Sequence, residues 1–423
     1  MIQIPFEKYA LRNGLRVVLS PEPRTPVVAV NLWYDVGSRN ERPGRTGFAH
    51  LFEHMMFQGS SHVPDTAHFA YIEKAGGSLN GSTWLDRTNY FETVPSHYLE
   101  LALWLESDRM GFLLPAMTQE KLDNQRDVVK NERRWRVDNQ PYGDWDERMQ
   151  ALMYPREHPY HHSVIGSMDD LDAASLEDVE TFFRTFYAPN NAVLTICGDY
   201  DRDRAVELIE QYFGDIQAGP PIPGIPGTLE LPPVLGVEKR ETVEQDISLA
   251  RTFVGYRIPR YGDERFYAAD VAATILGTGK ASLLNRTLVL KQQTAQDVAA
   301  YAFPIVVGAS ILVALATVAE GVQVERTEAD LLAAVDALRT IGDEDVARAV
   351  SLIEARHLTD LQRVDHRADA FSMMTTIFDE PDRVNTELDR YRAVTTTQVR
   401  EFASSFLGAD NRAILTYVPR AES

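Results

Sequence analysis

A proline- and glycine-rich segment divides this chain into two halves of similar length. Residues 218–227 contain four prolines and three glycines, a composition typical of a linker. The chain has 423 residues, which is more than one typical domain. We therefore expect an N-terminal half at 1–217, a linker at 218–230 and a C-terminal half at 231–423.

The two halves end in the same pattern, which indicates an internal duplication. In each half, apolar residues at i, i+3 and i+7 precede an asparagine and then a short apolar run. These residues are Val179, Phe182, Phe186 and Asn191 before 192–195, and Val399, Phe402, Phe406 and Asn411 before 413–416. The spacing predicts a helix, a turn and a strand. Because the match falls at the end of both halves, we expect related folds.

Local patterns predict a mixture of strands and helices. Runs rich in β-branched residues at 15–19, 27–34 and 192–197 read as strands. Helices are expected at 47–58, 65–75, 95–112, 118–136, 143–153 and 175–186. The uncharged stretch 298–319 is long enough to span a bilayer. Its Pro304 and its Val, Ile and Thr content favour two buried strands instead, so no membrane span is expected.

The charge balance and the cysteine content exclude several classes of protein. The chain has 42 Lys+Arg against 62 Asp+Glu, a formal net charge of −20. This acidity argues against a nucleic-acid partner, which needs a basic surface. Cys197 is the single cysteine and is expected to be buried and inert. The first residues show no signal peptide, which predicts a cytoplasmic protein; a periplasmic or secreted one stays open if a leader has been removed.

Two histidines and a glutamate lie within one short predicted helix. Residues 47–58 contain His50, Glu53 and His54, and Gly59 is a typical helix terminator. Helical residues four apart lie on one face, so both imidazoles can reach one metal ion. Glu53 can face the same site without being a ligand, which suits a base that activates water.

The alternative is that these are surface or core residues without a metal. The pattern His-x-x-Glu-His arises by chance in about two of every hundred chains of this size. However, the helix is apolar nearly all round, which predicts burial. Buried ionisable groups are costly unless they are paired or metal-bound, so the setting favours a metal site.

A third ligand is expected from a distant part of the chain, because catalytic zinc usually takes three protein ligands. The predicted helix 118–136 has an inward stripe formed by Leu122, Gln125, Val129 and Glu132. A carboxylate on an apolar face needs a partner. The spacing alone leaves two candidates open: a metal ion, or an arginine such as Arg109 or Arg133.

These residues resemble the inverted zinc motif of the pitrilysin-type (M16) metallopeptidases. His50, Glu53 and His54 are followed by Glu132, which lies 78 residues after His54 in Val-Val-Lys-Asn-Glu-Arg-Arg at 128–134. The similarity extends through Asn-Gly-Leu-Arg-Val-Val at 13–18, Asp-Val-Gly-Ser-Arg at 35–39, Gly-Gly-Ser-Leu-Asn-Gly-Ser-Thr at 76–83 and Tyr-Ala-Pro-Asn-Asn-Ala-Val-Leu at 187–194. Length and layout resemble the short-subunit branch related to mitochondrial processing peptidase.

The resemblance implies a fold, a cofactor and a reaction. The fold would be α+β, with two homologous halves, each a mainly antiparallel sheet packed against helices, as in LuxS and mitochondrial processing peptidase. One Zn²⁺ per chain would be held by His50, His54 and Glu132, with Glu53 activating water for hydrolysis of a peptide bond. Peptide substrates would add as a strand beside the zinc, along Gly77, Ser78, Leu79, Asn80 and Gly81.

Two departures from the family pattern bear on activity. Gln125 stands where many members have a glutamate that supports the zinc site. Glutamine can still form hydrogen bonds but carries no charge, so we expect the groups around the zinc ligands to act on them differently. Self-sufficient members also carry an Arg and a Tyr that contact the peptide, and here Leu283 and Gln296 occupy those places. We therefore expect a heterodimer, rather than a homodimer, with a homologous zinc-less subunit that supplies both. The alternative is a non-catalytic scaffold or a peptide-binding subunit.

Overall fold

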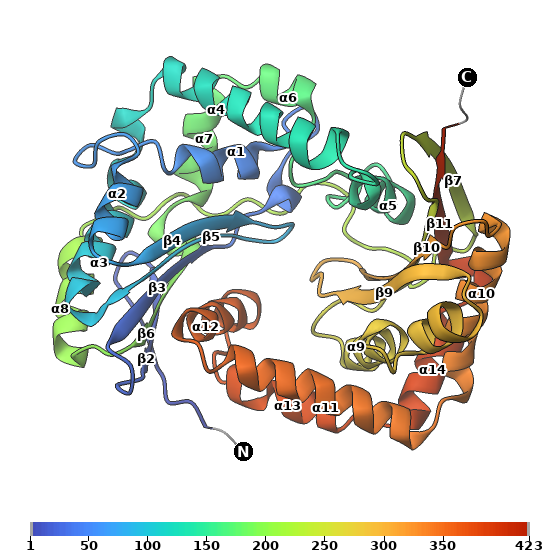
Figure 1. The fold of residues 1–423 in the computed structure, drawn as a ribbon. Helices are drawn as coiled ribbons and strands as arrows, with labels where there is room; N and C mark the ends of the chain where they lie inside the picture. The colour runs from blue at the N-terminus through green and yellow to red at the C-terminus, as the bar shows by residue number, and fades with distance from the viewer. Residues whose placement is uncertain (1–2, 421–423) are drawn as a thin grey trace. The chain divides into compact units, whose positions relative to one another are not determined.

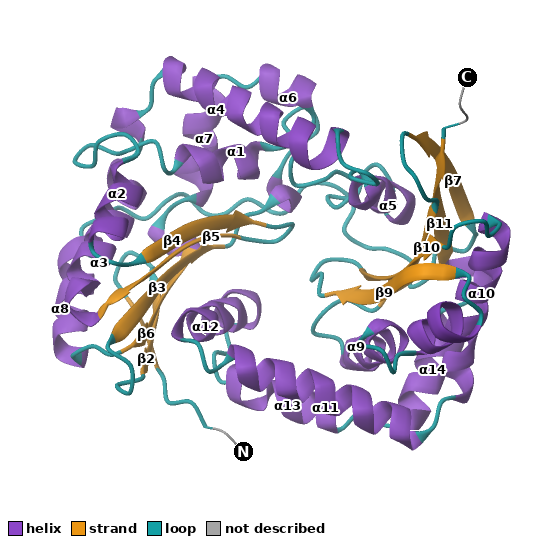
Figure 2. Ribbon diagram, viewed as in Figure 1, coloured by secondary structure: helices purple, strands orange, loops and turns teal. Residues whose placement is uncertain are grey.

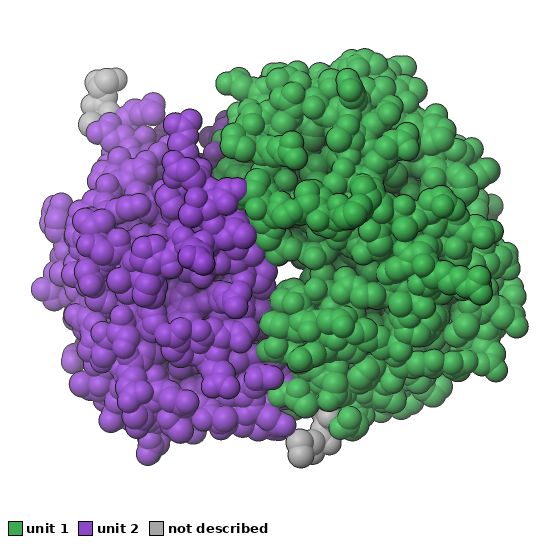
Figure 3. Space-filling view, turned by 180° about the vertical axis from the view of Figure 1, so that it is seen from behind, with its two compact units in different colours: residues 1–133, 162–226, 358–386 green, residues 134–161, 227–357, 387–423 purple. Residues whose placement is uncertain are grey.

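Two β-sheets form the frame of the chain, which the computed structural model describes from residue 3 to residue 420 (Figures 1 and 2). Contacts within the chain divide it into two units, coloured separately in Figure 3. Unit 1 comprises the chain up to Arg133, His162–Pro226 and Leu358–Thr386. Unit 2 comprises Arg134–His161, Gly227–His357 and the chain from Glu387 onward. The fold is α+β with two halves, as predicted.

The sheet of unit 1, called sheet A, has six strands, all antiparallel to their neighbours except β2 and β6, which are parallel. Its order is β1 (Glu7–Ala10), β2 (Arg16–Pro21), β6 (Ala192–Gly198), β3 (Val27–Tyr34), β5 (Thr88–Pro95) and β4 (Ser78–Thr83). Strand β4 therefore lies at one edge. This edge matters because β4 also contacts the helix that carries the two histidines.

Helices cover one face of sheet A and enclose the main core of unit 1. They are α1 (Phe48–Met55), α2 (Ala67–Lys74), α3 (Leu99–Phe112), α4 (Gln119–Arg133), α6 (Met168–Asp172), α7 (Leu176–Phe186) and α8 (Arg202–Phe213). Leu51, Phe52 and Met55 of α1 are completely buried in this core. The prediction of a buried α1 is thus confirmed, although the helix is shorter than 47–58.

The opposite face of sheet A is covered by α12 (Val364–Phe378), which comes from the second half of the sequence (Figure 1). This helix packs mainly on β3 and β6. Trp33 and Cys197 of the sheet form a second core with Ala368 and Phe371 of α12. Because both faces of β3 are buried, its sequence is a nearly continuous apolar run instead of an alternating one.

The half-buried carboxylate of Asp369 fixes α12 to the sheet, and its loss should destabilise the protein. Asp369 Oδ1 accepts hydrogen bonds from Asn31 Nδ2 (3.3 Å), Trp33 Nε1 (2.9 Å) and Asn89 Nδ2 (3.1 Å). We expect Asp369→Ala to lower the free energy of unfolding by about 2–3 kcal/mol, because buried donors lose their acceptor. Chemical denaturation measures this change. The control Asp360→Ala removes an exposed carboxylate and should change stability by less than about 1 kcal/mol. Equal stability of the two variants would contradict the anchoring role.

The sheet of unit 2, called sheet B, repeats the pairing of sheet A with one strand fewer. Its order is β7 (Lys239–Gln245), β11 (Arg412–Pro419), β8 (Arg251–Ile258), β10 (Ser310–Val318) and β9 (Ala295–Phe303). β7 and β11 are parallel and the other neighbours are antiparallel. The stretch 298–319 therefore contributes to two strands, as predicted, but only β10 is buried; β9 lies at the edge of the sheet and is largely exposed or half-buried, so the prediction of two buried strands was wrong for β9. Within residues 3–420, no helix combines the length and the apolar character needed to cross a membrane.

Sheet B also receives a helix from the other half of the sequence. The helices whose residues belong wholly to unit 2 are α5 (Trp145–Met153), α9 (Glu264–Gly277), α10 (Val324–Asp336) and α14 (Thr396–Phe406). The remaining helices, α11 (Asp343–Asp360) and α13 (Arg383–Arg392), contain boundaries between the units. Helix α5 packs on β8 and β11, where Trp145 stacks on Phe253 with ring centroids 5.0 Å apart. Each sheet is thus completed by a helix from the other half.

The repeated sequence pattern forms the same structure in both units. Asn191 follows α7 and precedes β6, and Asn411 follows α14 and precedes β11. Each asparagine donates its side-chain amide to the carbonyl at the end of the preceding helix, Asn191 to Phe186 (2.9 Å) and Asn411 to Phe406 (2.6 Å). The same hydrogen bond in both units explains why both halves have an asparagine at this point of the sequence pattern.

Candidate metal centre

Helices α1 and α4 bring three potential ligands together in unit 1. His50 and His54 lie one turn apart on α1, with ring centroids 4.9 Å apart. Glu132 lies near the end of α4, and its Oε2 is 3.6 Å from His50 Nε2 and 3.2 Å from His54 Nε2. One ligand atom from each residue lies within 4.8 Å of the others. Within residues 3–420, no other group of three such side chains is arranged this way.

The donor set and the distances fit a zinc ion. Two imidazole nitrogens and one carboxylate oxygen are typical ligands of catalytic zinc. In a tetrahedral site with metal–ligand distances near 2.0–2.1 Å, ligand atoms lie roughly 3.3–3.4 Å apart. The two distances to Glu132 bracket this value. The 3.6 Å separation between Glu132 Oε2 and His50 Nε2 is too long for a direct hydrogen bond, whereas the 3.2 Å separation from His54 Nε2 is at the upper limit of one.

Glu53 also lies near His54 and Glu132, but its carboxylate accepts a hydrogen bond from Thr83. Its Oε2 accepts a hydrogen bond of 2.6 Å from Thr83 Oγ1, at the end of β4. Gly81, two residues earlier on the same strand, allows this approach, because a Cβ there would lie 3.1 Å from Glu53 Cγ. We did not predict the role of Thr83 from the sequence. The sequence did offer a signal for this contact: Thr83 lies two residues after Gly81, so the two residues share one face of the strand.

The surroundings of Glu53 raise its pKa. Burial is the largest cause, because it penalises the charged carboxylate. The hydrogen bond from Thr83 and the neighbouring His54 act in the opposite direction, while the nearby carboxylate of Glu132 raises the pKa further. A carboxyl group with a raised pKa is a stronger base when ionised, which suits a group that takes a proton from water.

The arginines considered as partners of Glu132 make other contacts. Arg109 is completely buried and pairs with Glu106 and Glu92. Arg133 donates from Nη1 to the carbonyl of Gly166 at 2.9 Å. Gln125 is 6% exposed, on the inward side of α4 as predicted, and its effect on zinc stays a prediction. Glu132 Oε2 lies within 4 Å of both histidine Nε2 atoms, and whether its partner is a metal ion stays a prediction.

The predicted peptide-binding residues lie on or just before the edge strand β4. Ser78, Leu79, Asn80 and Gly81 are the first four residues of β4, and Gly77 precedes it. Within sheet A, β4 pairs only with β5. The other edge of the strand is thus not used by the sheet, as binding of a peptide strand requires.

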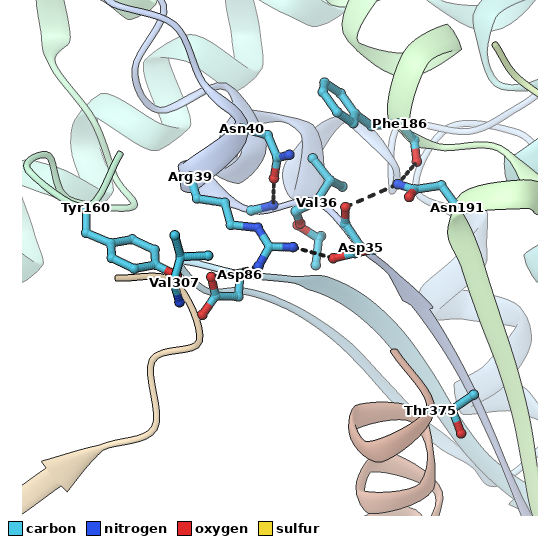
Figure 4. A network of polar contacts seen from close by, with 12 residues as sticks. Asp35, Val36, Arg39, Asn40, Asp86, Tyr160, Phe186, Asn191, Val307 and Thr375 are labelled. Atoms are coloured by element: carbon cyan, nitrogen blue, oxygen red, sulfur yellow. Dashed lines mark hydrogen bonds and ion pairs between the residues drawn. The ribbon is translucent and has the colours of Figure 1, made fainter. Parts of the chain in front are cut away.

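The segment before α1 is fixed to the turn that follows β4. Arg39 pairs with both Asp35 and Asp86, and Asn40 Oδ1 accepts the N–H of Gly37 at 3.1 Å (Figure 4). A Cβ on Gly37 would lie 2.4 Å from the carbonyl oxygen of Leu85. The sequence similarity at 35–39 therefore corresponds to a close backbone contact beside the candidate site.

His158, His161 and His162, which lie close together in the sequence, and Leu283 and Gln296 are not part of this group of potential ligands. His158 and His161 belong to unit 2, whereas His162 belongs to unit 1, and they form no metal cluster among the described residues. Leu283 is half-buried, and Gln296 is exposed on the edge strand β9. It stays a prediction that a partner subunit supplies the Arg and the Tyr that these two positions lack.

Comparison with known proteins identifies the family. Residues 16–157 match the family model described as "Insulinase (Peptidase family M16)", and residues 173–353 match "Peptidase M16 inactive domain". The chain belongs to the M16 peptidase family.

Several curated relatives are described as zinc proteases. The zinc protease PqqE of Helicobacter pylori is 33% identical over 293 residues, which are 69% of this chain and 65% of that protein. The probable mitochondrial-processing peptidase subunit beta of Arabidopsis thaliana is 25% identical over 268 residues, 63% of this chain and 50% of that protein. The chain matches about 60–65% of the length of the first three relatives.

A solved structure shares the fold over nearly the whole chain. The crystal structure of a protease from Helicobacter pylori has a TM-score of 0.92 and 26% sequence identity, and the match covers 98% of this chain and all of that one. The M16 inactive domain from Pseudomonas fluorescens has a TM-score of 0.86 at 18% identity, over 99% of both chains, and shows the fold alone.

Proposed function

We propose that this chain is a zinc-dependent endopeptidase that hydrolyses short or unfolded peptides. His50, His54 and Glu132 would hold one zinc ion, and Glu53 would act as the general base. The observation that carries the proposal is the convergence of two α1 imidazoles and the α4 carboxylate, with both distances to Glu132 Oε2 close to those of a tetrahedral zinc site. Similarity to proteins described as zinc proteases supports it.

The protein residues have separate tasks in this reaction. Zinc, when bound, polarises the scissile carbonyl and lowers the pKa of the attacking water. Glu53 takes a proton from that water and gives it to the leaving amine. Thr83 holds one oxygen of Glu53 through its hydrogen bond, which leaves the other oxygen for the proton. Residues 77–81 hold the peptide through backbone hydrogen bonds that tolerate different side chains.

We further propose that the chain works as the zinc subunit of a heterodimer. Leu283 and Gln296 offer no cation and no phenol at the places where self-sufficient members contact the peptide. A homologous zinc-less subunit would supply these groups. Similarity to a mitochondrial-processing peptidase beta subunit supports a paired assembly.

The experiment is a peptidase assay on the purified chain with and without its partner. The metal is removed with a chelator, zinc is returned, and a fluorogenic peptide library is added to the chain alone and to its mixture with the zinc-less homologue. We expect cleavage only when zinc and the partner are both present. Efficient cleavage by the chain alone would contradict the heterodimer. No cleavage in any mixture, despite one bound zinc per chain, would contradict the peptidase.

One observation favours the alternative of a non-catalytic scaffold or peptide-binding subunit. Residues 173–353 match a model described as an inactive domain. The alternative predicts peptide binding without hydrolysis in every mixture. The cytoplasmic location also stays a prediction; a similar fold, at 19% identity, is that of the first half of the periplasmic protease PqqL from Escherichia coli.

A further inference from the structure

A buried carboxylate caps the helix that carries both histidines. Glu41 is 4% exposed. Its Oε2 accepts the N–H of Gly47 at 2.9 Å, and its Oε1 accepts the N–H of Ala49 at 2.8 Å. The first N–H groups of a helix have no partner within the helix, and a negative charge there is favourable. Because both oxygens are used, the cap fixes the rotation of the first turn of α1, where His50 lies.

His162 orients this carboxylate. Its Nε2 lies 2.9 Å from Glu41 Oε2 and 3.1 Å from the carbonyl oxygen of Ser38. Both neighbours are acceptors, so Nε2 must carry the hydrogen. The imidazole therefore donates to Glu41 and ties it to the segment that precedes α1. The candidate metal centre does not use His162, and this contact gives that histidine a structural role.

The residues after His162 contact both ligand-bearing helices. Gly166 and Gly47 approach so closely that a Cβ on Gly166 would lie 2.2 Å from Gly47 N, and both have positive φ, +71° and +87°. The carbonyl of Gly166 accepts a hydrogen bond of 2.9 Å from Arg133 Nη1. Arg133 follows Glu132 directly at the end of α4. One short loop, 162–167, therefore touches the start of α1 and the end of α4.

We propose that the 162–167 loop, acting through Glu41 and Arg133, sets the distance between the proposed zinc ligands of α1 and α4. Glu41 and His162 are positioning residues, neither ligands nor catalytic groups. This inference rests on the proposed zinc site. It explains why ligands 78 residues apart in the sequence meet within a few tenths of an ångström of tetrahedral spacing.

The test measures zinc affinity by competition with a chromophoric chelator in the full-length chain. We expect Glu41→Gln and His162→Gln to weaken zinc binding by about tenfold or more, the range typical of groups that orient metal ligands. The matched control is His161→Gln. His161 is the neighbouring histidine, but its Nδ1 contacts the carbonyl of Tyr154 in unit 2, so its loss should leave zinc affinity unchanged. Unchanged affinity in His162→Gln and Glu41→Gln would overturn the proposal.

Two further readouts separate positioning from general destabilisation. The visible spectrum of the cobalt-substituted protein reports ligand geometry, and it should shift in Glu41→Gln and His162→Gln but not in His161→Gln. The double variant should lose about as much affinity as Glu41→Gln alone, because His162 acts through Glu41. Additive losses, or an unshifted cobalt spectrum, would overturn the positioning role. His162→Gln is the milder change and carries the test even if Glu41→Gln does not fold.

The proposed function and this inference fail in different ways. A wild-type chain that takes up no zinc would contradict the proposed function, and the inference with it. A wild-type chain that binds one zinc tightly, with variants that bind it equally well, would contradict the inference alone.

Discussion

Replacing Glu53 by glutamine should lower kcat by about 10³-fold while zinc stays bound, within the 10²–10⁴-fold range of general acid–base catalysis. The amide has nearly the same shape as the carboxylate, and its carbonyl can still accept the hydrogen bond from Thr83. It cannot take a proton from water. Because Glu53 is not among the three proposed ligand residues, we expect the affinity for zinc to change little.

The measurement combines steady-state kinetics with zinc quantification on the same samples, in the presence of the partner subunit. Glu73→Gln is the matched control, since Glu73 is an exposed glutamate of α2, and it should behave as wild type. Near-normal cleavage by Glu53→Gln would show that another group moves the proton.

Replacing Glu132 by alanine should have the largest effect on zinc itself. Glu132 is the one carboxylate within reach of both His50 and His54 in the described cluster. Losing a direct ligand should weaken zinc binding by more than about 100-fold, because even the groups that orient ligands account for about 10–100-fold. Peptidase activity should fall with zinc occupancy.

Chelator competition and metal analysis after dialysis check this expectation. Glu120→Ala is the control, because Glu120 is an exposed glutamate of the same helix, α4, and should keep one zinc per chain. If Glu132→Ala also kept one tightly bound zinc, the metal would lie elsewhere or take another third ligand.

The sequence predicted the parts of the site that depend on local geometry. His50 and His54 are four residues apart on a short apolar helix, so their common face follows from helical spacing alone. The inward direction of Glu132 followed from the stripe it shares with Leu122 and Val129. Its partner did not follow, because an arginine satisfies a carboxylate as well as a metal does. In the structure Arg109 pairs with Glu106 and Arg133 donates to the carbonyl of Gly166, while a metal ion as the partner of Glu132 stays a prediction.

Contacts between distant segments were not predictable in the same way. The sequence of α12 does not indicate that this helix covers sheet A. The sequence of α5 likewise does not indicate that it packs on sheet B. The apolar run of β3 predicted a strand, but not that helices bury both its faces nor which helix buries the second face. The hydrogen bonds of Thr83 to Glu53 and of His162 to Glu41 likewise join residues 30 and 121 positions apart. Such pairs are set by the tertiary fold, which periodicity does not describe.

The central claim is that His50, His54 and Glu132 together hold a zinc ion. An anomalous difference map at the zinc absorption edge, from crystals of the wild-type protein soaked with zinc, tests it most directly. We expect one strong peak about 2.0–2.2 Å from His50 Nε2, His54 Nε2 and a carboxylate oxygen of Glu132. A map with no peak between these three side chains, or with its strongest peak on other residues, would contradict it.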